Sequence, residues 1–116
     1  MGKRLNKAVG VQGEISAEDY LKKQKYKILE LNYVCKLGEI DIIAVDKKSS
    51  TIVFVEVKRR HTLAFGRPSE AVNLHKQAKI RRAAEEFLIR NHLLDSLVRF
   101  DVIDILDEEL NHINLG

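Results

Sequence analysis

Two strand-forming segments carry acids where strands usually bury apolar side chains, and this conflict constrains the fold most. They lie in the stretch 38–60, GEIDIIAVDKKSSTIVFVEVKRR, which is rich in β-branched residues and contains one short polar turn. If that turn is the loop 47–50, an antiparallel register sets Asp41 opposite Glu56 and Glu39 opposite Lys58. The sequence therefore predicts a hairpin on which two carboxylates meet.

Like charges that face each other on a sheet are destabilising, and partial burial adds to the cost. A divalent cation between Asp41 and Glu56 would remove this conflict. A second interpretation stays open, in which Glu39 and Lys58 form an ordinary cross-strand ion pair and the two acids lie at a solvated edge. The register is decisive, because a loop of odd length without a bulge would put the two acids on opposite faces.

Two helices are expected around this hairpin. The first spans about residues 6–25, or starts later if Ser16 and Asp19 cap it. The second spans about residues 74–93, with a core-facing stripe formed by Ile80, Ala83, Ala84, Phe87 and Leu88. Lys76 and Lys79 extend that stripe into the first turn, where positive charge opposes the helix dipole, so an anion or the acidic cluster is their expected partner.

Further strands are predicted at residues 26–34 and 99–106, and about residues 108–116 should form a polar surface extension. The order is then helix, three strands, helix, strand. It predicts a single α/β domain over residues 1–116, with a mixed central sheet covered by helices on both faces.

The formal net charge is only +3, but the basic residues are clustered. Such clusters give a nearly neutral protein a positive surface for phosphates, although a solvated lysine face remains the alternative. No aromatic residues are interleaved with the clusters, which argues against a single-strand binder that stacks bases. The clusters are Lys3, Arg4 and Lys7; Lys22, Lys23, Lys25 and Lys27; Lys58, Arg59 and Arg60; and Lys76, Lys79, Arg81 and Arg82.

Cys35 is the only cysteine, which excludes a disulfide framework and a thiolate zinc site. The sequence shows no signal-peptide pattern and no apolar run of the roughly 20 residues that span a bilayer, so a cytoplasmic location is expected. The histidines show no paired ligand spacing and are expected at the surface: His61, His75, His92 and His112.

The acids and one lysine suggest hydrolytic chemistry. Asp41, Glu56 and a helical Glu14 supply the oxygen ligands that Mg²⁺ or Mn²⁺ prefers, and such a metal neutralises a phosphodiester and activates a bound water. Lys58 follows Glu56 by two residues, so it lies on the same side of its strand and can orient that water or stabilise developing charge.

Six segments carry a family resemblance: GVQGE at 10–14, GEIDIIA at 38–44, FVEVKR at 54–59, Gly66 and Pro68 with EAV at 70–72, Lys76 with Lys79 and Ile80, and RFDVI at 99–103. In them the chain resembles the YraN-like (UPF0102) family, which is similar to Holliday-junction resolvases of the PD-(D/E)XK nuclease superfamily. The resemblance implies a restriction-endonuclease-like fold.

The resemblance also implies roles for individual residues. Asp41 matches the central metal-binding aspartate, Glu56 the second acid, Lys58 the motif lysine and Glu14 the acid of the first helix. Two positions depart from the usual pattern. Ile40 replaces the proline of the superfamily motif, and Lys25 occupies a helix-to-strand turn where close relatives usually have glycine.

The expected function is a Mg²⁺- or Mn²⁺-dependent endonuclease acting on DNA, with branched or otherwise structured DNA as a candidate substrate. Phosphate contacts are expected from Arg59, Arg60, Lys76 and Lys79. A homodimer would suit a resolvase, and its apolar candidates are Leu93, Leu94, Leu97 and Val98. The alternatives are a non-catalytic nucleic-acid-binding module that keeps the nuclease fold, and an RNA-directed or assembly protein whose acids are structural.

Overall fold

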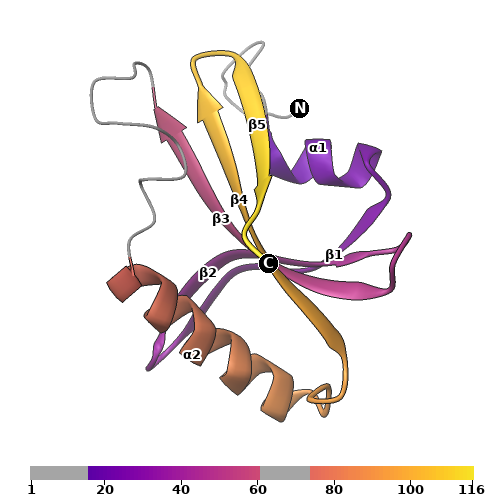
Figure 1. Ribbon diagram of the computed structural model, residues 1–116, viewed down its shortest axis with the longest axis vertical. Helices are drawn as coiled ribbons and strands as arrows, with labels where there is room; N and C mark the ends of the chain where they lie inside the picture. Colours follow the sequence, from indigo (N-terminus) through magenta and orange to yellow (C-terminus); the bar gives the residue numbers. More distant parts are fainter. Residues whose placement is uncertain (1–15, 61–73) are drawn as a thin grey trace.

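The computed structural model of the chain describes residues 16–60 and 74–116, and Figure 1 shows its arrangement. In these residues the elements are α1 (Ala17–Lys23), β1 (Tyr26–Cys35), β2 (Gly38–Asp46), β3 (Thr51–Arg60), α2 (Leu74–Arg90), β4 (Leu97–Leu106) and β5 (Glu109–Asn114). The strands form one sheet in the order β1-β2-β3-β4-β5. Neighbouring strands are antiparallel except β3 and β4, which are parallel, so the predicted mixed α/β sheet is confirmed.

The hairpin of β2 and β3 has the predicted register. Its pairs run from Asp46 with Thr51 to Ile42 with Val55, around the loop 47–50. The Asp46 side chain closes the turn, because its Oδ1 accepts a hydrogen bond from the N–H of Lys48 at 3.0 Å. Because the loop has an even number of residues, the same register continued beyond Ile42 and Val55 brings Asp41 next to Glu56 on one face of the sheet.

The two faces of the sheet are covered by different helices, which lie on opposite sides of it in Figure 1. On one face Phe87 of α2 packs in a core with Ile43 and Phe54. On the other face Leu21 of α1 packs in a core with Val53 and Ile103. Side chains of a strand alternate between faces, so each central strand supplies both cores, and the predicted covering of both faces is confirmed.

Helix α1 has the capped start that the sequence offered as its second option. Ser16 is the N-cap, and its Oγ accepts a hydrogen bond from the N–H of Asp19 at 3.2 Å. The upstream part of the predicted helix lies outside the described residues. Beyond the helix, Lys25 has a φ of 70°, a left-handed conformation in which glycine is least strained.

The prediction for the C-terminal residues was wrong. Residues Glu109–Asn114 are not an extension but form the strand β5, which pairs with β4 along its length. The strand is hard to recognise because its apolar residues, Leu110 and Ile113, alternate imperfectly with polar ones. The second helix ends at Arg90, three residues before its predicted end at Leu93. Within residues 16–60 and 74–116, no helix is long and apolar enough to cross a membrane.

Candidate metal and nucleic-acid site

Asp41 lies where the ladder between β2 and β3 ends. The last backbone pair is Ile42 with Val55, and beyond it the N–H of Val57 donates to Oδ2 of Asp41 at 2.7 Å. This hydrogen bond fixes one carboxylate oxygen of a half-buried side chain. Burial raises the pKa of Asp41, and the adjacent negative charge of Glu56 raises it further against the opposing effect of the Val57 N–H.

Glu56 of β3 is 8% exposed and is contacted by two ammonium groups. Its Oε2 lies 2.5 Å from Nζ of Lys76, at the start of α2, and 3.4 Å from Nζ of Lys58. The contact with Lys76 confirms that this first-turn lysine has the acidic cluster as its partner. Glu56 is therefore a nearly buried acid that carries two positive charges at one oxygen.

The two lysines also affect each other. The neighbouring ammonium of Lys76, followed by burial, lowers the pKa of Lys58. Burial lowers the pKa of Lys76 as well, but its contact with Glu56 outweighs burial and raises that pKa above the ordinary value. Lys76 is therefore the more firmly charged of the two, and Lys58 gives up its proton more readily than an ordinary lysine.

Asp41, Glu56 and Lys76 line a cleft of about 540 Å³ between the start of β2 and the first turns of α2. The strand and helix approach closely at Gly38, where a Cβ atom would lie 3.1 Å from the carbonyl oxygen of Lys79. The lining residues are Gly38, Glu39, Asp41, Glu56, His75, Lys76, Lys79 and Ile80. The cleft thus combines two carboxylates with a basic helix wall.

The predicted site residues fall into distinct groups. Asp41, Glu56 and Lys58 come together, whereas Glu14 lies outside the described residues. Glu39 lines the cleft and is exposed, and Lys58 pairs with Glu56 in place of its expected partner Glu39.

The predicted phosphate contacts differ in exposure. Lys79 and Arg59 are exposed, and the Lys76 side chain is 38% exposed. Arg60 is only 14% exposed in its side chain, and its Nε lies 3.4 Å from Oδ1 of the fully buried Asp104. Arg60 is thus held in an ion pair within the protein.

The donor atoms present suit a hard divalent cation. Asp41 and Glu56 offer carboxylate oxygens, which Mg²⁺ and Mn²⁺ prefer, and Mg²⁺ often uses one or two carboxylates together with water. Over residues 16–60 and 74–116, no three side chains of His, Cys, Asp or Glu gather as a metal site. A cation held by the described residues would therefore rest on Asp41 and Glu56, with water completing its shell.

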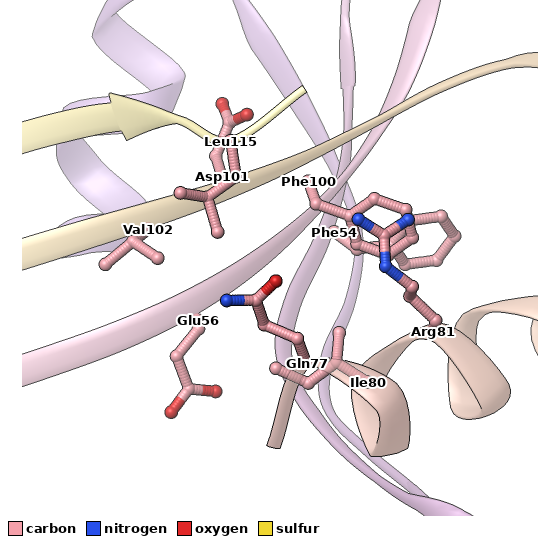
Figure 2. A pocket seen from close by; sticks show the side chains of 9 residues that line it. All are labelled: Phe54, Glu56, Gln77, Ile80, Arg81, Phe100, Asp101, Val102 and Leu115. Atoms are coloured by element: carbon pink, nitrogen blue, oxygen red, sulfur yellow. The ribbon is translucent and has the colours of Figure 1, made fainter. Parts of the chain in front are cut away.

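A second, apolar cleft adjoins Glu56 on its β4 side, and Figure 2 shows its lining. Phe54 and Phe100 stack there with ring centroids 5.5 Å apart, and the guanidinium of Arg81 lies 4.6 Å from the Phe100 centroid. The sequence showed no aromatic residue among its basic runs because Phe100 comes from a distant strand. The fold therefore places an aromatic ring beside a basic helix after all.

A polar network behind the sheet also escaped the sequence analysis. His112 Nε2 lies 2.6 Å from Oδ2 of Asp101, and His112 Nδ1 lies 2.9 Å from the hydroxyl of Tyr20. Asp101 is 2% exposed and receives two further hydrogen bonds from Arg99. The expectation of a surface position was wrong for His112. The sequence did contain one indication of this network: Asp101 lies in a predicted strand, and a buried acid needs hydrogen-bond partners.

The sequence comparison identifies the family. The family described as Uncharacterised protein family UPF0102 matches residues 13–105 of the chain. The chain belongs to this family. A UPF0102 protein of Caldicellulosiruptor saccharolyticus is 47% identical over 110 residues, covering 92% of each chain. A UPF0102 protein of Alkaliphilus oremlandii is 52% identical over 103 residues, covering 87% of this chain and 86% of the relative.

Two solved structures are similar to this UPF0102 chain. A repair endonuclease from Pyrococcus abyssi matches with a TM-score of 0.47 and 19% identity, over 78% of this chain and 37% of the endonuclease. The structure of an EndoMS–dsDNA complex matches with a TM-score of 0.46 and 15% identity, over 85% of this chain and 38% of that one. The chain therefore spans less than two-fifths of each of these proteins.

Proposed function

We propose that the chain is a metal-dependent endonuclease that hydrolyses phosphodiester bonds of DNA. The observation that carries the proposal is the meeting of Asp41 and Glu56 in a cleft walled by a basic helix. Lys58 lies beside Glu56. This arrangement is the one that the resemblance to the PD-(D/E)XK superfamily implies. A phosphodiester is anionic, so it suits the lysines of the same cleft.

Asp41 and Glu56 would hold Mg²⁺ or Mn²⁺. When bound, the ion polarises the phosphate and lowers the pKa of a coordinated water. The protein contributes position and charge. The hydrogen bond from Val57 fixes Oδ2 of Asp41, and Lys58 lies close enough to Glu56 to orient a water or to stabilise charge on the phosphate.

The phosphate contacts of the proposal come mainly from exposed basic side chains. Lys79 lines the cleft, and Arg59 is exposed near the end of β3. Arg60 would contribute less than Lys79 and Arg59, because Asp104 holds its side chain and offsets its charge. Branched or otherwise structured DNA is the proposed substrate class, and the cytoplasm is the proposed location.

A homodimer is proposed through the end of α2 and the start of β4. Leu94 is 59% exposed and Leu97 is 66% exposed, whereas Leu93 and Val98 pack against the core. Two of the four predicted contact residues are therefore available. Light scattering at micromolar concentration should give a dimeric mass that falls to a monomer in Leu94→Glu/Leu97→Glu, and a monomeric mass for the wild type would contradict the dimer.

A second candidate function rests on the contacts of Glu56. Because Lys58 and Lys76 already balance its charge, the cluster is stable as a group of ion pairs without a metal. The chain would then be a non-catalytic nucleic-acid-binding module, with binding that depends on salt but is indifferent to Mg²⁺.

Cleavage assays distinguish the two functions. Linear duplex, single strand, flap and four-way junction are incubated with Mg²⁺ or Mn²⁺ and with wild type, Asp41→Asn, Lys58→Ala or the control Glu39→Gln. The nuclease predicts metal-dependent cutting that is lost at least about 100-fold in the first two variants and kept in the control. Binding without cutting on every substrate would favour the non-catalytic module.

A further inference from the structure

The contact between Lys76 and Glu56 joins α2 to β3 at the cleft, beside the core in which Phe87 of α2 packs with Phe54 of β3. Lys76 lies in the first turn of α2, and that turn contains no acidic residue. A positive charge there is unfavourable for the helix dipole by about 0.3–1 kcal/mol. The position of Lys76 is therefore explained by its partner on β3 and not by the stability of its own helix.

The ammonium of Lys76 contacts one of the two Glu56 oxygens that could bind a metal. It lies 2.5 Å from Oε2 of Glu56, which is a charge-assisted hydrogen bond that uses this oxygen directly. Lys58 already lies 3.4 Å from the same oxygen. A divalent cation bound to Glu56 would repel both ammonium groups at close range, which favours displacement of one of them.

Lys76 is the group that is able to move. Lys58 extends from the same strand as Glu56, two residues away, and its side chain is 25% exposed. Lys76 reaches Glu56 from a different element, and its side chain is 38% exposed on the wall of the cleft. Its flexible stem lies on the wall of a cleft of about 540 Å³, which His75 and Lys79 also line.

We infer that Lys76 is an exchangeable counter-ion of Glu56, which leaves the acid when a divalent cation binds and then contacts a phosphate of the nucleic acid. This inference rests on the proposed function. Metal binding releases the Lys76 ammonium, which is then available to contact a phosphate. The metal and the nucleic acid therefore each increase the affinity for the other. Before the metal binds, the same lysine keeps the paired carboxylates from repelling each other.

The direct test is calorimetric titration of Mn²⁺ into wild type, Lys76→Met and Lys79→Met without nucleic acid. Lys79 lines the same cleft, so Lys79→Met measures the general effect of removing one positive charge there. Lys76→Met should bind Mn²⁺ about fivefold more tightly than Lys79→Met, because the competitor at Glu56 is gone. Lys76→Met should also melt at a lower temperature than Lys79→Met without metal. Lys76→Gln serves as a second variant if Lys76→Met folds poorly.

A second readout follows the released lysine onto DNA. The salt dependence of duplex binding is measured with and without Ca²⁺, used as a divalent ion that supports little cleavage. In wild type and Lys79→Met, Ca²⁺ should steepen the slope by about one phosphate contact, whereas Lys76→Met should show no such change.

The outcomes separate this inference from the proposed function. If wild type binds Mn²⁺ and Lys76→Met binds it no more tightly than Lys79→Met, the exchange is refuted while the metal site stands. If wild type binds no Mn²⁺, both the exchange and the metal-dependent nuclease are refuted.

Discussion

The Nε2 atom of His112 lies 2.6 Å from Oδ2 of Asp101, and this contact joins the last strand of the sheet to an acid that is 2% exposed. Arg99 donates to both oxygens of the same carboxylate at 2.9 Å. Tyr20 connects the network to α1 through His112. The network thus links α1, β4 and β5 on the face of the sheet opposite Asp41 and Glu56.

Replacing His112 with alanine should lower the free energy of unfolding by about 1.5–3 kcal/mol, because a buried carboxylate loses a charge-assisted hydrogen bond. Urea denaturation checks this value. The matched control is Asn111→Ala, an exposed neighbour on β5, which should change stability by less than about 0.5 kcal/mol. Equal effects of the two variants would show that Asp101 does not depend on His112.

The same network should make the fold sensitive to acid. Burial raises the pKa of Asp101, but the hydrogen bonds from His112 and Arg99 outweigh burial and lower it below the ordinary value. The stability from this lowered pKa is present above the unfolded value of about 4 and is lost as pH falls through the folded value. Urea midpoints between pH 7 and pH 3 should fall at the acid end, less steeply in His112→Ala. Parallel profiles would contradict this.

Asp41→Asn should stabilise the metal-free protein by up to about 1 kcal/mol at pH 7, because burial and Glu56 disfavour the charged form. A raised pKa means that the folded state binds its proton more readily, so stability falls as pH rises through this range. The gain should therefore vanish below about pH 4. Thermal melts at both pH values test the sign, and a loss of stability at pH 7 would be the opposite result.

Lys25→Gly should raise the free energy of unfolding by about 0.5–1 kcal/mol. Lys25 has a φ of 70°, and relief of left-handed strain exceeds the added entropy of glycine in the unfolded chain. The control is Lys27→Gly in β1, where glycine should destabilise. Chemical denaturation of both variants gives the comparison, and destabilisation by Lys25→Gly would show that the turn tolerates lysine without strain.

The hairpin could be predicted because its determinants are local. Alternation of side chains and an even loop fix the register near Asp46, and the register places Asp41 near Glu56. The partner of Lys58 could not be fixed in the same way. The backbone pairing ends at Ile42, and beyond it the N–H of Val57 donates to the Asp41 carboxylate. The register therefore does not predict the partner of Glu39.

The last strand and the apolar cleft depend on contacts between distant residues. β5 has weak apolar alternation, and its place is set partly by the contact of His112 with Asp101. The stack of Arg81 on Phe100 likewise joins α2 to β4. Local sequence patterns do not predict contacts between residues that are distant in the sequence. A buried acid in a predicted strand does indicate that a partner is needed.

The most direct measurement of the central claim is Mn²⁺ binding to wild type, Asp41→Asn and Glu39→Gln by calorimetry. Asp41 and Glu39 line the same cleft, and only Asp41 adjoins Glu56. The paired-carboxylate site predicts binding in wild type, a loss of at least about tenfold in Asp41→Asn, and a change within about twofold in Glu39→Gln. Equal affinity in all three proteins, or no binding in wild type, would contradict a metal site at Asp41 and Glu56.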